Sequence, residues 1–264
     1  MYKLVVIDID DTLLNDQGII LEETKAALNK AQERNVTIAL ATGRMFVSAK
    51  KIADQIGGNI PLITYQGALI KESDGTILSE QFVPSEVIEK VISFCEARNY
   101  HLQMYSRDQL FVKEKNEKVE IYTKMHNVSF IVEPDFTRLI EEPVNKMVIF
   151  EEPALISQIQ TQLAQKIGAN SYITKSKPFF LEILNSHASK AHAISKLCEH
   201  LGYQLSEVIG IGDSWNDVGL LTNVGLPVAM GNAVEDLKKI AKVITSSNNE
   251  NGVGRVIEKY ILND

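Results

Sequence analysis

The feature that most constrains the fold is an alternation of short apolar segments and amphipathic segments, present at both ends of the chain but not in its middle. Branched apolar residues dominate the short segments, and good helix formers with apolar spacing lie between them. The strand candidates are residues 4–9, 36–41 and 62–65 in the first part, and 208–211 and 226–230 in the last. Buried strands that alternate with helices are typical of a parallel sheet covered by helices.

Residues 84–185 break this alternation. Helix candidates around 88–95 and 156–163 accompany several strand candidates that follow one another without an intervening helix. These strand candidates are 101–105, 109–113, 128–132, 146–150 and 179–184. Strands in direct succession are typical of an antiparallel sheet. We therefore predict a doubly wound, Rossmann-like α/β core formed by residues 1–83 and 186–264, interrupted by an inserted α+β domain.

Composition excludes several classes of partner. The chain has 264 residues, of which 45% are hydrophobic and 23% charged, as in a globular protein of one large or two smaller domains. A formal charge of -7 and a pI near 5.4 argue against a nucleic-acid-binding protein, which usually needs a basic face. An anionic substrate would have to be attracted locally, by a metal and a few cationic side chains.

Membrane insertion and secretion are also not indicated. No apolar run approaches the roughly 18 residues needed to span a bilayer, and the first residues lead into a strand candidate without the layout of a signal peptide. Cys95 and Cys198 lie in expected helices and form no paired framework, which fits a reducing compartment. We expect a cytoplasmic protein, monomeric or weakly dimeric, with neither membrane nor nucleic acid as a partner.

Acidic residues follow the first strand candidate. Asp8, Asp10 and Asp11 place three carboxylates in four positions, where they repel one another unless a cation holds them together. Ligands in open α/β sheets bind beyond the carboxyl ends of the strands. Aspartate is also a common turn former, so this segment alone does not distinguish a site from a turn.

A second acidic segment follows the strand candidate 208–211. Asp213 and Asp217 lie there at the start of a predicted helix, where the helix dipole alone would also favour acids. Two acidic strand ends in one sheet are harder to attribute to turn and helix preferences. Carboxylate oxygens suit Mg²⁺, which takes few protein ligands and keeps several waters. The two segments together therefore predict a Mg²⁺ site.

Two further segments could bind an anion. Thr42 and Gly43 end an apolar strand and begin a helix, which makes an anion site, although a capping threonine and a flexible turn would explain them too. Lys190 begins a predicted helix, where its positive charge opposes the helix dipole, so a separate negative partner would explain it better than helix stability does. Taken alone, a lysine at this place is usually a solvated surface residue. The five histidines have no metal-binding spacing, and neither a P-loop nor a complete G-x-G-x-x-G is present.

Together, these segments resemble the haloacid dehalogenase superfamily of phosphatases. The order is Asp-x-Asp, a Thr at a strand end, a Lys, and Gly-Asp-x-x-Asn-Asp, which begin here at Asp8, Thr42, Lys190 and Gly212. Residues 84–185 resemble the type-two (IIB) α/β cap of the Cof-like phosphatases, which selects the substrate. The resemblance covers nearly the whole chain and is weakest within this insertion. Additional matches lie at 67–68, 228–233 and 250–253.

The resemblance implies a Mg²⁺-dependent phosphatase that acts on small phosphorylated metabolites, such as sugar phosphates or phosphorylated cofactors. Asp8 is similar to the nucleophile that becomes an aspartyl-phosphate, and Asp10 to the general acid and base whose backbone carbonyl reaches the metal. Asp213 is similar to the remaining carboxylate ligand of Mg²⁺, and Asp217 to an outer acid that supports the metal or Lys190. The residues similar to the phosphoryl-binding set are Thr42, Gly43, Lys190 and Asn216.

Three residues depart from the pattern of the superfamily. Asp11 stands where glycine is common, Ala191 where glycine is frequent, and Gln66 where asparagine is usual. Asp11 and Ala191 are expected to alter loop geometry without removing a catalytic group. The amide of Gln66 reaches one methylene further than that of asparagine, so the sequence does not decide whether it contacts the substrate.

Two alternative functions remain open at this point. A phosphosugar mutase keeps the same core and a similar cap, and a regulator could bind a phosphorylated ligand without turnover. Such a regulator would typically have lost the nucleophile, the acid or the lysine, all of which are present here. Dehalogenation needs no Mg²⁺, so Asp10 and Asp213 argue against it, and a pump would need membrane helices.

Overall fold

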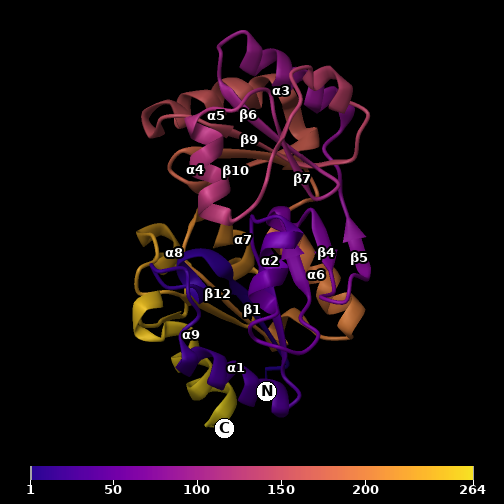
Figure 1. Ribbon diagram of the computed structural model, residues 1–264. Coiled ribbons are helices and arrows are strands. Elements are labelled where there is room, and N and C mark those ends of the chain that lie inside the picture. Colours follow the sequence, from indigo (N-terminus) through magenta and orange to yellow (C-terminus); the bar gives the residue numbers. More distant parts are fainter. Residues whose placement is uncertain (1, 264) are drawn as a thin grey trace. The chain divides into compact units, whose positions relative to one another are not determined.

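The computed structural model describes residues 2–263 and divides into two compact units (Figure 1). The core unit comprises Met1–Gly43, Ala49–Ser79 and Ser189–Asp264, and the inserted unit comprises Arg44–Ser48 and Glu80–Ala188. Among the described residues, no helix has both the length and the apolar character required to cross a membrane.

An eight-stranded sheet forms the centre of the core unit, with the order β14-β13-β12-β1-β2-β3-β4-β5. Neighbours from β14 to β3 pair in parallel, and β4 adds to β3 in the antiparallel sense. Every residue of β1 is buried, as in strands covered on both faces. The strands are β1 (Leu4–Asp8), β2 (Thr37–Ala41), β3 (Leu62–Thr64), β4 (Leu69–Lys71), β5 (Ile77–Glu80), β12 (Val208–Gly212), β13 (Leu226–Ala229) and β14 (Val243–Ile244).

The helices of the core unit pack in groups, since α1 contacts α9 and α6 contacts α7. Helix α6 begins after Ser189, whose hydroxyl oxygen accepts a hydrogen bond from the His192 backbone N–H, and ends before Gly202, which has a φ of 71°. These capping residues place Lys190 in the first turn of α6. The helices of the core unit are α1 (Glu22–Glu33), α6 (Lys190–Leu201), α7 (Val218–Thr222), α8 (Glu235–Ile240) and α9 (Gly252–Ile257). Helix α2 (Phe46–Ala53) is divided between the units, since residues 46–48 belong to the inserted unit and residues 49–53 to the core unit.

A six-stranded sheet of order β10-β11-β9-β6-β7-β8 forms the inserted unit together with three helices (Figure 1). All its neighbours pair in the antiparallel sense except β7 and β8. Residues of α3 and α5 share one apolar core with alternate residues of the sheet, including Met104, Met147 and Ile183. The elements are α3 (Ser85–Glu96), β6 (His101–Ser106), β7 (Gln109–Val112), α4 (Glu117–His126), β8 (Ile131–Val132), β9 (Val144–Phe150), α5 (Pro153–Ile167), β10 (Ser171–Lys177) and β11 (Phe180–Asn185).

The predicted fold class is confirmed, with a doubly wound parallel core and an inserted α+β unit. The sequence did not predict α4, in which only Val119, Tyr122 and His126 are buried, so that its apolar periodicity is weak. It also missed β10, an edge strand whose residues are mostly half-buried and polar. The strand predicted at 128–132 is reduced to β8, and both residues of β8 are exposed.

Candidate active site

Three neighbouring strands bring polar residues to one edge of the core sheet. Strand β1 ends at Asp8, β2 is followed directly by Thr42, and β12 is followed directly by Asp213. These strands are parallel neighbours in the order β12-β1-β2, and Asp8 lies opposite Ala41 in their register. The carboxyl ends of parallel strands meet at the same edge, where ligands bind in such sheets.

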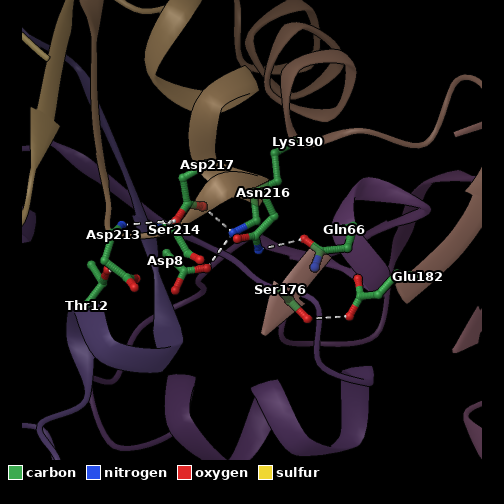
Figure 2. Close-up of polar contacts among 10 residues, drawn as sticks. All are labelled: Asp8, Thr12, Gln66, Ser176, Glu182, Lys190, Asp213, Ser214, Asn216 and Asp217. Atoms are coloured by element: carbon green, nitrogen blue, oxygen red, sulfur yellow. Dashed lines mark hydrogen bonds and ion pairs between the residues drawn. The ribbon is translucent and has the colours of Figure 1, made fainter. Parts of the chain in front are cut away.

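Lys190 lies between two buried carboxylates (Figure 2). Its ammonium forms an ion pair with Asp8 Oδ1 and lies 2.6 Å from Asp217 Oδ1, and the three side chains are almost fully buried. Burial alone would lower the pKa of Lys190, but Asp217 and Asp8 outweigh it and raise this pKa above its ordinary value. A positively charged ammonium is therefore held beside Asp8.

Asp217 uses both of its carboxylate oxygens within the protein. Its Oδ1 binds Lys190, and its Oδ2 accepts hydrogen bonds of 3.1 Å from the backbone N–H groups of Asp213 and Ser214. Asp213 accepts a hydrogen bond of 2.7 Å from the hydroxyl of Thr12 at one oxygen, Oδ1. Asp217 is therefore arranged to support Lys190 and the loop after β12, whereas Asp213 is better placed to bind a ligand.

Asp8, Asp213 and Asp217 form an acidic cluster in which one oxygen of each lies within 4.8 Å of the others. Burial raises the pKa of Asp8 well above its ordinary value; Lys190 opposes this effect, and repulsion from Asp217 and Asp213 adds to it. Burial also raises the pKa of Asp213 to about 7, and repulsion from Asp217 contributes. Three buried carboxylates with one ammonium leave an excess of negative charge, which a divalent cation would compensate.

Asp10 lies in the turn Ile9–Leu13, directly after Asp8, and is half-buried. Its negative charge is one of the smaller causes that raise the pKa of Asp8, after burial and the charges of Asp217 and Asp213. The φ of Asp11 is 59°, in the left-handed region, which explains why a glycine is suited to this position. Aspartate tolerates this conformation better than most residues, so the turn forms despite the departure.

The predicted phosphoryl-binding residues lie on three different segments of the core unit. Thr42 is buried and is followed by Gly43, the residue at which this segment of the core unit ends. Asn216 donates a hydrogen bond of 3.0 Å from Nδ2 to Oε1 of Gln66, a contact drawn in Figure 2. The structure thus joins Lys190 directly to the acidic cluster and joins Asn216 to Gln66, while Thr42 follows the strand next to Asp8.

Two site residues had no assigned role in the sequence analysis. Thr12 belongs to the Asp-rich segment after β1. Its hydroxyl donates a hydrogen bond to Asp213, a contact between distant residues that the sequence could not predict. Gln66 was noted only as a departure, yet it contacts Asn216. Ala191, another departure, packs its methyl group against Gly219 in the contact between α6 and α7. A Cβ added to Gly219 would lie only 3.2 Å from this methyl group.

Comparisons with known proteins place the chain in a family. The sequence matches the haloacid dehalogenase-like hydrolase family over residues 5–257. A protein of Streptococcus pyogenes serotype M6, provisionally described as a phosphatase, is 33% identical over 99% of both chains. The 5-amino-6-(5-phospho-D-ribitylamino)uracil phosphatase YcsE of Bacillus subtilis is 27% identical, over 98% of this chain and 96% of its own.

A solved structure shows the same fold over both units. The subclass IIB sugar phosphatase BT4131 matches with a TM-score of 0.88 and 24% identity, over 98% of this chain and 98% of its own. Its likeness concerns the fold alone, whereas the sequence relatives are named as phosphatases. The family resemblance predicted from the sequence is confirmed. The chain therefore belongs to the haloacid dehalogenase-like hydrolases, as a phosphoric monoester hydrolase with the subclass IIB fold.

Proposed function

We propose that this phosphatase hydrolyses small phosphorylated metabolites in two steps, with Asp8 as the nucleophile and Mg²⁺ as the cofactor. The observation that carries the proposal is the position of Lys190, which Asp217 holds beside Asp8. A fixed cation at this place compensates for the charge of the carboxylate and of an approaching phosphate ester. Phosphoryl transfer requires little else beyond alignment of the reacting atoms.

In the first step, Asp8 attacks the phosphorus atom, the bond to the leaving oxygen breaks, and an aspartyl-phosphate forms. Asp10 donates its proton to the leaving alkoxide. In the second step, Asp10 takes a proton from water while the water oxygen attacks phosphorus, which releases inorganic phosphate and restores Asp8. The place of Asp10 in the turn after Asp8, with its charge acting on Asp8, supports this role.

Mg²⁺ would be held by Asp8, Asp213 and the backbone carbonyl of Asp10. When bound, the ion supplies positive charge that lets an anionic carboxylate approach an anionic ester. The raised pKa values of Asp8 and Asp213 support this assignment, because both groups need a cation to stay ionised. Asp217 supports the set indirectly through Lys190, and Thr12 orients Asp213.

Thr42, the Gly43 amide, Lys190 and Asn216 would bind the phosphoryl oxygens. For the rest of the substrate, we propose a sugar or polyol phosphate, since the YcsE relative is named for a phosphorylated ribityl compound. Residues 84–185 would act as the cap that selects it. The names of the relatives favour hydrolysis over the mutase alternative. The cytoplasmic location and the monomeric or weakly dimeric state stay predictions.

The test of this function is hydrolysis of p-nitrophenyl phosphate by an Asp8→Asn variant, with Mg²⁺ and with a chelator. We expect the variant to lose at least about a thousandfold in kcat, because the amide is a poor nucleophile. Asp54→Asn is the matched control, since Asp54 is exposed just after α2 and its carboxylate forms a surface ion pair with Lys50. Full Mg²⁺-dependent activity in the Asp8→Asn variant would exclude Asp8 as the nucleophile. Phosphate release across a panel of metabolites would then identify the substrate.

A further inference from the structure

The turn Tyr65–Gly67, between β3 and β4, adopts a backbone conformation that needs support from its surroundings. Tyr65 has a φ of 49° and Gln66 a φ of 58°, both in the left-handed region, and Gly67 has a φ of 105°. The side chains of Tyr65 and Gln66 are buried. Two successive non-glycine residues in this region are strained, and such strain persists only where neighbouring structure holds it. The surroundings of the turn therefore need an explanation.

Gln66 connects two of the residues that we propose to bind the phosphoryl group. Its backbone N–H donates a hydrogen bond of 2.9 Å to the carbonyl oxygen of Thr42. Its side-chain Oε1 accepts a hydrogen bond of 3.0 Å from Nδ2 of Asn216 (Figure 2). The strained turn is thus bonded to the segment after β2 on one side and to the loop before α7 on the other.

The same turn packs directly against the beginning of α6. A Cβ on Gly67 would lie 2.6 Å from the carbonyl carbon of Ser189 and 3.1 Å from the backbone nitrogen of Lys190. Only a residue without a side chain permits this approach. The position of the turn is therefore set by Thr42 and by the helix that carries Lys190, so the turn cannot shift freely.

We propose that Gln66 is a positioning residue that orients the amide of Asn216 toward the phosphoryl group, an inference that rests on the proposed function. One N–H of the Asn216 amide binds Gln66, which fixes the amide plane and therefore the direction of the second N–H. A reversed Asn216 amide would place its oxygen against Oε1 of Gln66, with two acceptors facing each other. Gln66 acts in this way without touching the substrate itself.

Gln66→Met tests the proposal, because it keeps the length of the side chain and removes the acceptor. We would measure the binding of inorganic phosphate by calorimetry with Mg²⁺ present, and kcat and KM for p-nitrophenyl phosphate. We expect phosphate to bind about 3- to 10-fold more weakly and KM to rise equally. The kcat should change little, because Asn216 holds the phosphoryl group in the ground state and the transition state alike. Gln55→Met, at an exposed glutamine of the core unit, should behave as the wild type.

A second variant guards against misfolding of the turn. In Gln66→Asn, the new asparagine tolerates the left-handed backbone, but its amide is one methylene shorter. The turn is held too firmly to move toward Asn216 and restore the hydrogen bond. It should weaken phosphate binding in the same direction as Gln66→Met. Unchanged phosphate binding in either folded variant would overturn the proposal.

Asn216→Ala separates orientation of the amide from general packing. If Gln66 acts through Asn216, Gln66→Met should cause no further loss of phosphate binding in this background. If the loss of phosphate binding in the double variant instead equals the product of the two single-variant losses, Gln66 acts independently of Asn216 and the proposal is wrong. Phosphate binding does not require Asp8 to attack phosphorus. A failure of the proposed mechanism, seen as activity of Asp8→Asn, is therefore distinguishable from a failure of this inference.

Discussion

Removal of one carboxylate from the acidic cluster should change how the stability of this protein depends on pH and on Mg²⁺. Burial raises the pKa of Asp213 to about 7 in the folded protein, whereas an aspartate in an unfolded chain titrates near about 3.9. Between these values the folded protein binds more protons than the unfolded chain. The free energy of unfolding contributed by Asp213 therefore rises as the pH falls through 7, and the unfavourable buried charge is fully present above 7.

The size of this effect follows from the two pKa values. The full difference of about three units corresponds to an upper limit of about 4 kcal/mol. Between about pH 8 and about pH 5.5, the part that titrates is about 2 kcal/mol. His101 works in the opposite sense, because burial lowers its pKa to about 4 and its protonation in the unfolded chain reduces stability as the pH falls below 6.5. A comparison with Asp213→Asn cancels this contribution of His101, which is present in both proteins.

Urea unfolding of the wild type and of Asp213→Asn, at both pH values, measures the difference. In the presence of a chelator we expect Asp213→Asn to be the more stable protein at pH 8, by a margin that falls by about 2 kcal/mol at pH 5.5. Saturating Mg²⁺ should stabilise the wild type at pH 8 far more than the variant, because the ion favours the ionised carboxylate. If the difference in the free energy of unfolding between the wild type and Asp213→Asn did not change with pH in the chelator, the raised pKa of the buried Asp213 would be refuted. Equal stabilisation of both proteins by Mg²⁺ would refute its role as a ligand.

Two further predictions concern the turns beside the cluster. Asp10→Asn should slow ester cleavage by about 10²- to 10⁴-fold for sugar phosphates but less for p-nitrophenyl phosphate, whose leaving group needs no proton. Equal losses of kcat/KM for both substrates would exclude Asp10 as the general acid, because kcat/KM reports ester cleavage and not the later step in which Asp10 acts as the base. Gly67→Ala should lower the free energy of unfolding by about 2–5 kcal/mol in thermal or urea denaturation, because the new Cβ meets the Ser189 backbone. Gly18→Ala, with a φ of +73° but nothing within 4 Å of its Cβ, should lose only about 1 kcal/mol, and similar losses at both glycines would contradict the steric argument.

The local pattern of the chain determined much of the fold, because burial imposes a period on the sequence wherever an element has one consistently buried face. The five core strands predicted from apolar runs all form, and β1 and β12 are buried along their whole length. The pattern fails where burial is partial. Helix α4 presents few buried residues, and β10 is a half-buried edge strand, so neither leaves a clear period in the sequence.

The sequence alone predicted the acidic strand ends. Asp8 and Asp213 each follow an apolar run, and this pattern can be recognised without knowing which residues surround them in the fold. The contacts within the site were decided by the tertiary structure. Only the order β12-β1-β2 brings these two strand ends together, and only the packing of α6 directs Lys190 between Asp8 and Asp217. Likewise, the hydrogen bonds from Thr12 to Asp213 and from Asn216 to Gln66 join residues far apart in the chain. The local period of apolar residues shows which face of a helix or strand is buried. It does not show which side chains from distant parts of the chain will contact that face, because those contacts depend on how the elements pack.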